Sequence, residues 1–195
     1  MLLGVDDSLG RILTALEKAG VLDNTIVVFT SDHGYFYGEH CLSVERRLAY
    51  EEAIRIPLLV RYPPLIKVGT TFDPFVLSID LAPTLLAAAG APLPKNLHGR
   101  SLLRLLRGEA WQPRTSFLIE HFSDNVFPRV RNLGYQAVRT ERWKYIHYLD
   151  LPDADELYDL SADPYELHNL IHEAAAAKTR IDLRQELTRL LAQTP

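Results

Sequence analysis

The strongest structural signal in the chain is Thr25-Ile26-Val27-Val28-Phe29-Thr30-Ser31-Asp32-His33-Gly34. Its first half is a continuous β-branched and aromatic run, which is typical of a strand buried on both faces in a parallel sheet. Asp32 and His33 follow this run directly. Because ligands of open α/β sheets bind just past the carboxyl ends of strands, this position favours a functional site. A carboxylate oxygen and an imidazole nitrogen both suit a divalent cation, so the pair is a candidate metal site. The alternative interpretation is that the two residues form a simple polar turn.

The composition is that of an ordinary globular protein, and it limits the possible partners. The 195 residues are 47% hydrophobic and 24% charged, which is enough for one sizeable domain or a domain with an appendage. A net charge of −4 with both signs interspersed argues against nucleic acid as the main partner. Cys41 is the single cysteine, so no disulfide forms within the chain. No apolar run approaches the roughly 20 residues that cross a bilayer, and we expect no membrane span.

Helical and strand-like segments alternate in the first 111 residues. Apolar residues at helical spacing predict a helix from about Asp6 to Gly20, directly before the strand at 25–30. A second buried strand is predicted over 56–61, a short strand over 75–77, and helices over 79–89 and 101–107. This order predicts part of a largely parallel sheet sandwiched by helices, in an α/β domain that ends near residue 111.

The pattern changes near residue 112. Runs over 116–122, 135–140 and 143–149 are separated by turns, which predicts an antiparallel sheet. Residues 156–160 are predicted as a fourth strand or an extended segment, and 174–192 as a terminal helix rich in good helix formers. The predicted fold class is therefore α/β, followed by a small antiparallel-sheet subdomain with a C-terminal helix over 112–195.

A charged segment follows the Asp–His pair and contains Glu45, Arg46 and Arg47. A cation in such a loop, next to a metal, could hold the anionic oxygens of a substrate. The alternative is a solvated run of charges, in which surface ion pairs account for either arginine.

Five segments, in order along nearly the whole chain, resemble the C-terminal half of the sulfatase family in the alkaline-phosphatase-like superfamily. They lie within Val5–Leu13, Asp23–Gly34, Arg46–Val60, Asp80–Leu102 and Glu156–Leu170. Each segment alone is weakly specific, but five in the correct order are a strong signal. The resemblance makes 1–111 the C-terminal part of the α/β catalytic domain and 112–195 a small C-terminal subdomain.

The resemblance implies hydrolysis of sulfuric esters. Such enzymes hold one calcium or magnesium ion (Ca2+ or Mg2+) with an early acidic pair and with an Asp and an Asn or His from this later strand. Asp32 and His33 are carried over as metal ligands on that basis. The family nucleophile is a formylglycine made from a Cys/Ser-x-Pro-x-Arg motif, and the metal withdraws charge from the sulfate oxygens. The family lysine that contacts sulfate corresponds to Arg46, four residues before Tyr50, where a planar guanidinium replaces a compact ammonium.

The chain departs from the family in lacking both the nucleophile motif and the early acidic pair. Cys41 is not followed by x-Pro-x-Arg, and Asp6 and Asp7 belong to a later helix. We therefore expect a sulfatase fragment that is inactive alone, with a sulfate ester as substrate of the parent enzyme. The alternatives are a phosphonate or phosphate ester hydrolase of the same superfamily, or a non-catalytic remnant that binds an anion or a partner. We expect any targeting signal upstream of this chain, and its localisation stays open.

Overall fold

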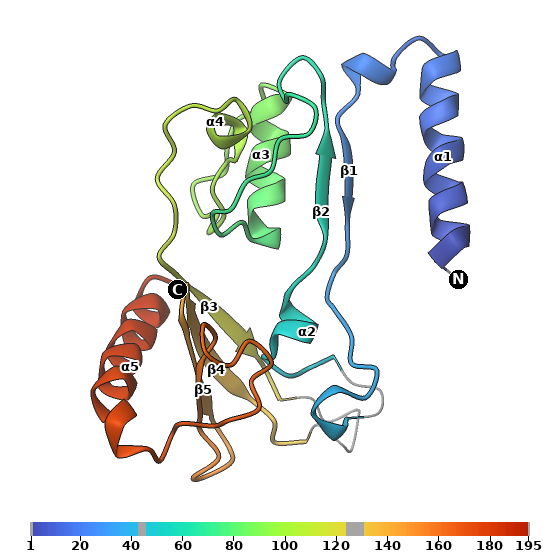
Figure 1. The fold of residues 1–195 in the computed structure, drawn as a ribbon. Coiled ribbons are helices and arrows are strands. Elements are labelled where there is room, and N and C mark those ends of the chain that lie inside the picture. Colours follow the sequence, from blue (N-terminus) through green and yellow to red (C-terminus); the bar gives the residue numbers. More distant parts are fainter. Residues whose placement is uncertain (1, 43–45, 124–130, 195) are drawn as a thin grey trace. The chain divides into compact units, whose positions relative to one another are not determined.

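The computed structural model describes residues 2–42, 46–123 and 131–194 (Figure 1). These residues form two compact units. The first comprises the described residues up to Asp32 together with 57–112, and the second comprises 33–56 together with 113 onward. Segment 33–56, which follows Asp32 in the chain, thus packs with the C-terminal part of the protein. None of the described helices is both long and apolar enough to cross a membrane.

The first unit combines helices with one pair of strands. Its elements are α1 (Leu2–Lys18), β1 (Val27–Thr30), β2 (Leu58–Arg61), α3 (Leu81–Ala88) and α4 (Leu103–Leu106). The two strands, α3 and α4 lie within the predicted ranges. The first helix begins at Leu2, four residues before the predicted start at Asp6, and residues 75–77 form no strand. Val28 and Val60 face Leu81 and Leu102 across an apolar cavity of about 20 Å³, so this face of the strand pair packs on α3 and α4.

The parallel sheet that the apolar runs predict is not confirmed. β1 and β2 pair antiparallel, with Val27 opposite Arg61 and Thr30 opposite Leu58. The predicted burial on both faces is not found either, since β1 and β2 contain no fully buried residue and Leu59 is 61% exposed. The physical reason is that an apolar run indicates a tendency to be buried and contains no information on strand direction. The direction of a strand depends on the path of the chain between the two strands, and here that path brings β2 beside β1 in the opposite direction.

The second unit confirms the predicted antiparallel sheet and C-terminal helix. The strands are β3 (Ser116–His121), β4 (Tyr135–Thr140), β5 (Trp143–Tyr148) and β6 (Glu156–Asp159), which pair in that order, and α5 (Ala177–Ala192) follows. The unit also contains α2 (Glu51–Ile54), a single helical turn from segment 33–56.

Both faces of this sheet are covered. Because side chains alternate along a strand, Tyr145 packs towards Leu183 of α5, whereas its neighbour Ile146 belongs to a second cluster that contains Ala49. β5 is consequently buried over most of its length. Burial on both faces is what places a charged residue of this strand, Lys144, out of contact with water.

Candidate functional site

The polar pair after β1 is divided between the two units, since Asp32 belongs to the first and His33 to the second. Asp32 is exposed and lies two residues beyond the end of β1. The Ser31 hydroxyl donates to its Oδ1 at 3.4 Å. The predicted strand end and the exposed carboxylate are therefore present in the first unit.

His33 is half-buried in the second unit, and its Nδ1 lies 2.7 Å from the carbonyl oxygen of Gly34. A carbonyl only accepts, so this contact favours the tautomer that has its proton on Nδ1. Nε2 then carries the lone pair, which is the form that a metal ligand requires.

Within the described ranges, no three or more His, Cys, Asp or Glu side chains gather closely enough to hold a metal ion. The pairing of Asp32 with His33 as metal ligands stays a prediction. The donor types fit a divalent cation, but a hard cation such as calcium takes six to eight ligands, more than this pair supplies.

Arg46 and Arg47 differ in their surroundings. Arg46 is exposed and Arg47 is half-buried, and neither belongs to a helix. Glu45, the acidic neighbour in the sequence, lies outside the described residues. The role of Arg46 in binding an anion stays a prediction.

The backbone after His33 lies directly against α2. The Gly34 N–H donates to the carbonyl oxygen of Ala53 at 2.7 Å. A Cβ at Gly34 would lie 1.9 Å from the carbonyl oxygen of Glu52, so only glycine fits here. The position of His33 is thus linked, through its neighbour, to the position of α2.

A histidine beside α2 is held by aromatic and ionic contacts. His40 stacks on Tyr50 with a centroid distance of 4.0 Å, and its Nε2 lies 3.3 Å from Glu52 Oε2. Phe36, which is fully buried, meets both rings edge-on. These contacts hold Phe36, His40 and Tyr50 together within the second unit.

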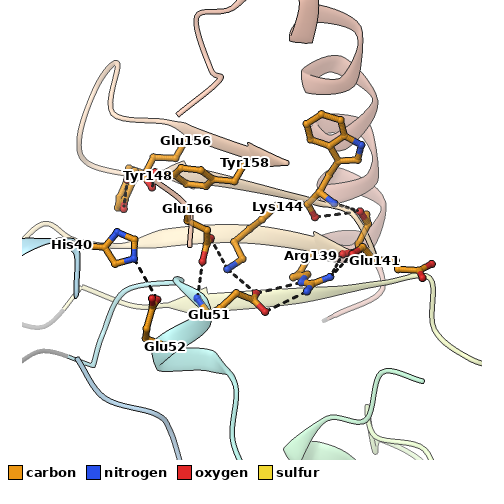
Figure 2. Close-up of polar contacts among 12 residues, drawn as sticks. His40, Glu51, Glu52, Arg139, Glu141, Lys144, Tyr148, Glu156, Tyr158 and Glu166 are labelled. Atoms are coloured by element: carbon orange, nitrogen blue, oxygen red, sulfur yellow. Dashed lines mark hydrogen bonds and ion pairs between the residues drawn. The ribbon is translucent and has the colours of Figure 1, made fainter. Parts of the chain in front are cut away.

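The sequence analysis missed a cluster of four charged residues that includes Glu51 of α2 (Figure 2). Lys144 Nζ lies 2.9 Å from Glu51 Oε1 and 2.7 Å from Glu166 Oε1, and its side chain is fully buried. Arg139 donates to both carboxylate oxygens of Glu51, at 3.3 and 3.2 Å. The Lys144 ammonium thus forms ion pairs with two carboxylates. The available signal was a lysine that shares one face of β5 with Ile146 and Tyr148.

The two carboxylates of this cluster respond differently to burial. Burial raises the pKa of Glu166 above its ordinary value, and the charge of Lys144 offsets only part of that effect. Burial also acts to raise the pKa of Glu51, but Lys144 and Arg139 together outweigh it and lower that pKa. Glu51 is therefore held as an anion between two cations.

Solved structures place this fold in a class of hydrolases. Over 99% of its length, the chain resembles a protein in complex with its substrate D-glucosamine-2-N,6-O-disulfate, with a TM-score of 0.91 and 37% identity. Over its full length it resembles the phosphonate monoester hydrolase of Agrobacterium radiobacter, with a TM-score of 0.89 and 31% identity. It covers 39% and 40% of those two chains. The fold is that of the alkaline-phosphatase-like superfamily.

The sequence narrows the class to one family. Residues 38–193 match the family described as N-sulphoglucosamine sulphohydrolase, C-terminal, and residues 1–74 match a protein family of unknown function. The chain is 39% identical to N-acetylglucosamine-6-O-sulfatase of Bacteroides thetaiotaomicron over 95% of its length. It is 36% identical to N-acetylglucosamine-6-sulfatase of Bos taurus over 87% of its length. The chain therefore belongs to the sulfatase family and corresponds to its C-terminal part, spanning 33% and 35% of these two relatives.

Proposed function

We propose that this chain is the C-terminal part of a sulfuric ester hydrolase and supplies part of its metal-binding and sulfate-binding site. The observation that supports this most directly is the likeness, over 99% of the chain, to a protein that holds a disulfated glucosamine as substrate. The family membership supports the same reaction class, because the similar curated proteins are sulfatases.

Asp32 and His33 are the proposed ligands of a calcium or magnesium ion. The exposed carboxylate of Asp32 is a hard oxygen donor, and the Nδ1 contact of His33 orients its imidazole with the lone pair on Nε2. The remaining ligands are proposed to come from upstream of this chain. When bound, the ion would draw negative charge away from the sulfate oxygens.

Arg46 is the proposed sulfate-binding cation. Its side chain is exposed, and a guanidinium offers paired N–H donors that match two oxygens of a tetrahedral anion. Its permanent positive charge favours the bound ester and the leaving sulfate alike. Its half-buried neighbour Arg47 is proposed to act in packing.

The nucleophile is proposed to be a formylglycine that lies outside this chain. No Cys/Ser-x-Pro-x-Arg motif occurs in the 195 residues. Cys41 is exposed, but it is followed by Leu42 and has no proline two residues on, so it does not match the motif.

A phosphonate or phosphate ester hydrolase is the second candidate, and the similarity to the phosphonate monoester hydrolase of Agrobacterium radiobacter favours it. Sulfate and phosphonate esters present similar tetrahedral anions, so Arg46 and the metal pair suit both. A non-catalytic remnant that binds an anion or a partner is the third, supported by the missing nucleophile motif.

Coding DNA upstream of Met1, followed by an activity assay, tests the proposal. An in-frame Cys/Ser-x-Pro-x-Arg motif is expected, and the extended protein, with its formylglycine installed, is expected to hydrolyse an aryl sulfate faster than an aryl phosphonate. The reverse preference would establish the second candidate. Stop codons without the motif would establish the remnant.

A further inference from the structure

The single turn α2 is fixed by the C-terminal sheet through both its side chains and its backbone. Glu51 contacts Lys144 on β5 and Arg139 on β4 through its carboxylate. Its own backbone N–H, at the start of the turn, donates to Glu166 Oε2 at 2.7 Å. Three residues remote in the sequence therefore converge on one residue of α2 (Figure 2).

The residue that accepts this N–H is itself held in an uncommon conformation. Glu166 has a φ of 52°, in the left-handed region that residues with a Cβ rarely adopt. Such conformations persist where the surrounding contacts determine them. Glu166 is only 2% exposed and contacts both Lys144 and α2, so these contacts are the ones that hold it.

The backbone of α2 also contacts the segment that contains His33. Gly34 donates its N–H to Ala53 at 2.7 Å, and no Cβ would fit between Gly34 and Glu52. A shift of α2 by a fraction of an ångström therefore moves Gly34, and with it the adjacent His33. The same turn directly follows the stretch from Arg46 to Tyr50.

We propose that Lys144, Glu166 and Arg139 are positioning residues, which fix α2 and thereby the placement of His33 and Arg46. The roles of His33 and Arg46 rest on the proposed function. The cluster contains two cations and two anions, so its charge is balanced. Losing Lys144 alone leaves two carboxylates in a buried site with Arg139 as the single cation of the cluster, and α2 is then expected to move away from the sheet so that water reaches the excess charge.

Hydrogen exchange of the Gly34 amide, followed by NMR in the 195-residue chain, tests the positioning directly. Lys144→Met is expected to accelerate Gly34 exchange about tenfold or more, while the amides of β4 and β5 keep their protection. Lys178→Met, which removes an exposed lysine of α5, is the matched control and is expected to leave Gly34 unchanged.

A second substitution tests whether Lys144 positions α2 through its charge or only by filling space. The double variant Lys144→Met/Glu166→Gln restores charge balance, and the side-chain amide introduced by Glu166→Gln still offers an oxygen to the Glu51 N–H. Gly34 protection is expected to return to within about threefold of the wild-type value. If Glu166→Gln instead lowers the protection of the Gly34 amide further, Lys144 acts through packing and the proposal is overturned.

Two further outcomes would also overturn the proposal. One is an unchanged rate of Gly34 exchange in Lys144→Met, and the other is an equal loss of amide protection at Gly34 and throughout the sheet. Should Lys144→Met fail to fold, Glu51→Gln decides, because it removes the charge that ties α2 to Lys144 and Arg139 and leaves the 2.7 Å pair of Lys144 with Glu166 in place. It is expected to accelerate Gly34 exchange in the same way. This readout uses neither substrate nor metal, so a failed sulfatase assay of the extended protein refutes the proposed function and leaves the positioning result standing.

Discussion

Gly34 leaves no room for a side chain next to the proposed metal ligand His33. An added Cβ would lie 1.9 Å from the Glu52 carbonyl oxygen and 3.2 Å from that of Arg55. Backbone atoms cannot rotate away as a side chain can, so α2 or the segment at His33 has to move. Local geometry at this single position therefore links the proposed metal ligand to the rest of the second unit.

Gly34→Ala is expected to lower the free energy of unfolding by about 2–3 kcal/mol, the cost of forcing a methyl group into a closed contact. Urea denaturation measures the change. Gly10→Ala is the control, because nothing lies within 4 Å of that position in α1 and alanine is the better helix former. Equal stability of the Gly34 and Gly10 variants would show that α2 does not pack against Gly34 in solution.

Arg46 and Arg47 are expected to differ in function as they differ in exposure. In the extended, formylglycine-containing enzyme, Arg46→Ala should lower kcat/KM for an aryl sulfate about tenfold or more, because one charge-assisted contact is lost. Arg47→Ala should change it little. A larger effect from Arg47→Ala would mean that Arg47, and not Arg46, contacts the sulfate.

At the scale of elements, one aspartate joins the β5–β6 hairpin to α5. Asp155 accepts from the Tyr145 hydroxyl at 2.5 Å and from Arg184 at 3.1 Å, and it lies 2.9 Å from His147 Nδ1. Burial acts to raise the pKa of Asp155, but these partners outweigh burial and lower it. Burial first, and then the Asp155 carboxylate, raise the pKa of Tyr145 to about 12, so the phenol stays a donor at neutral pH.

Asp155→Asn is expected to change how stability depends on pH. A carboxyl with a lowered folded-state pKa contributes stability above its unfolded pKa, here about 3.8, and loses it as pH falls through the folded-state value. The Tm difference between wild type and variant should therefore be greatest at neutral pH and shrink below pH 3.8. Thermal scans from about pH 7 down to about pH 2.5 measure it. Asp153→Asn, an exposed change in the same hairpin turn, is the control, and a Tm difference constant across this range would contradict the prediction.

At the scale of the whole molecule, the chain corresponds to about a third of its curated relatives, 33% in one case. Its first helix, α1, has no buried residue from Leu2 to Lys18. Leu2 and Leu3 are 82% and 80% exposed.

The 195-residue chain alone is expected to show no sulfatase activity, because catalytic residues act as a unit and the nucleophile motif is missing. Assays of the purified chain with an aryl sulfate check this. Turnover that co-purifies with the chain, and that is lost on Cys41→Ala, would instead identify a nucleophile within it.

Calcium binding by the isolated chain is expected to be weak, since Asp32 and His33 supply few of the ligands that calcium takes. The extended protein should bind much more tightly, and Asp32→Ala should abolish that gain. Titration calorimetry on both forms measures the difference. If the isolated chain binds calcium tightly and the Asp32→Ala variant still does so, the metal site lies at other residues.

The sequence by itself determined the antiparallel sheet and the C-terminal helix. The predicted strand over 135–140 coincides with β4, because alternating side chains and flanking turns are local signals that packing reinforces. The family, and with it the candidate roles of Asp32, His33 and Arg46, also followed from local motifs in a fixed order. Those roles remain predictions.

Only the tertiary structure decided the direction of β2 against β1 and the fate of the charged residues. Glu51 and Glu166 are 115 positions apart, and their residue types are those of solvated surface groups. A strand pattern does not show that both faces of β5 are covered, which is the condition that buries Lys144 and forces it to pair. Strand direction and charge pairing both depend on contacts between distant segments, and a local pattern contains no information about such contacts.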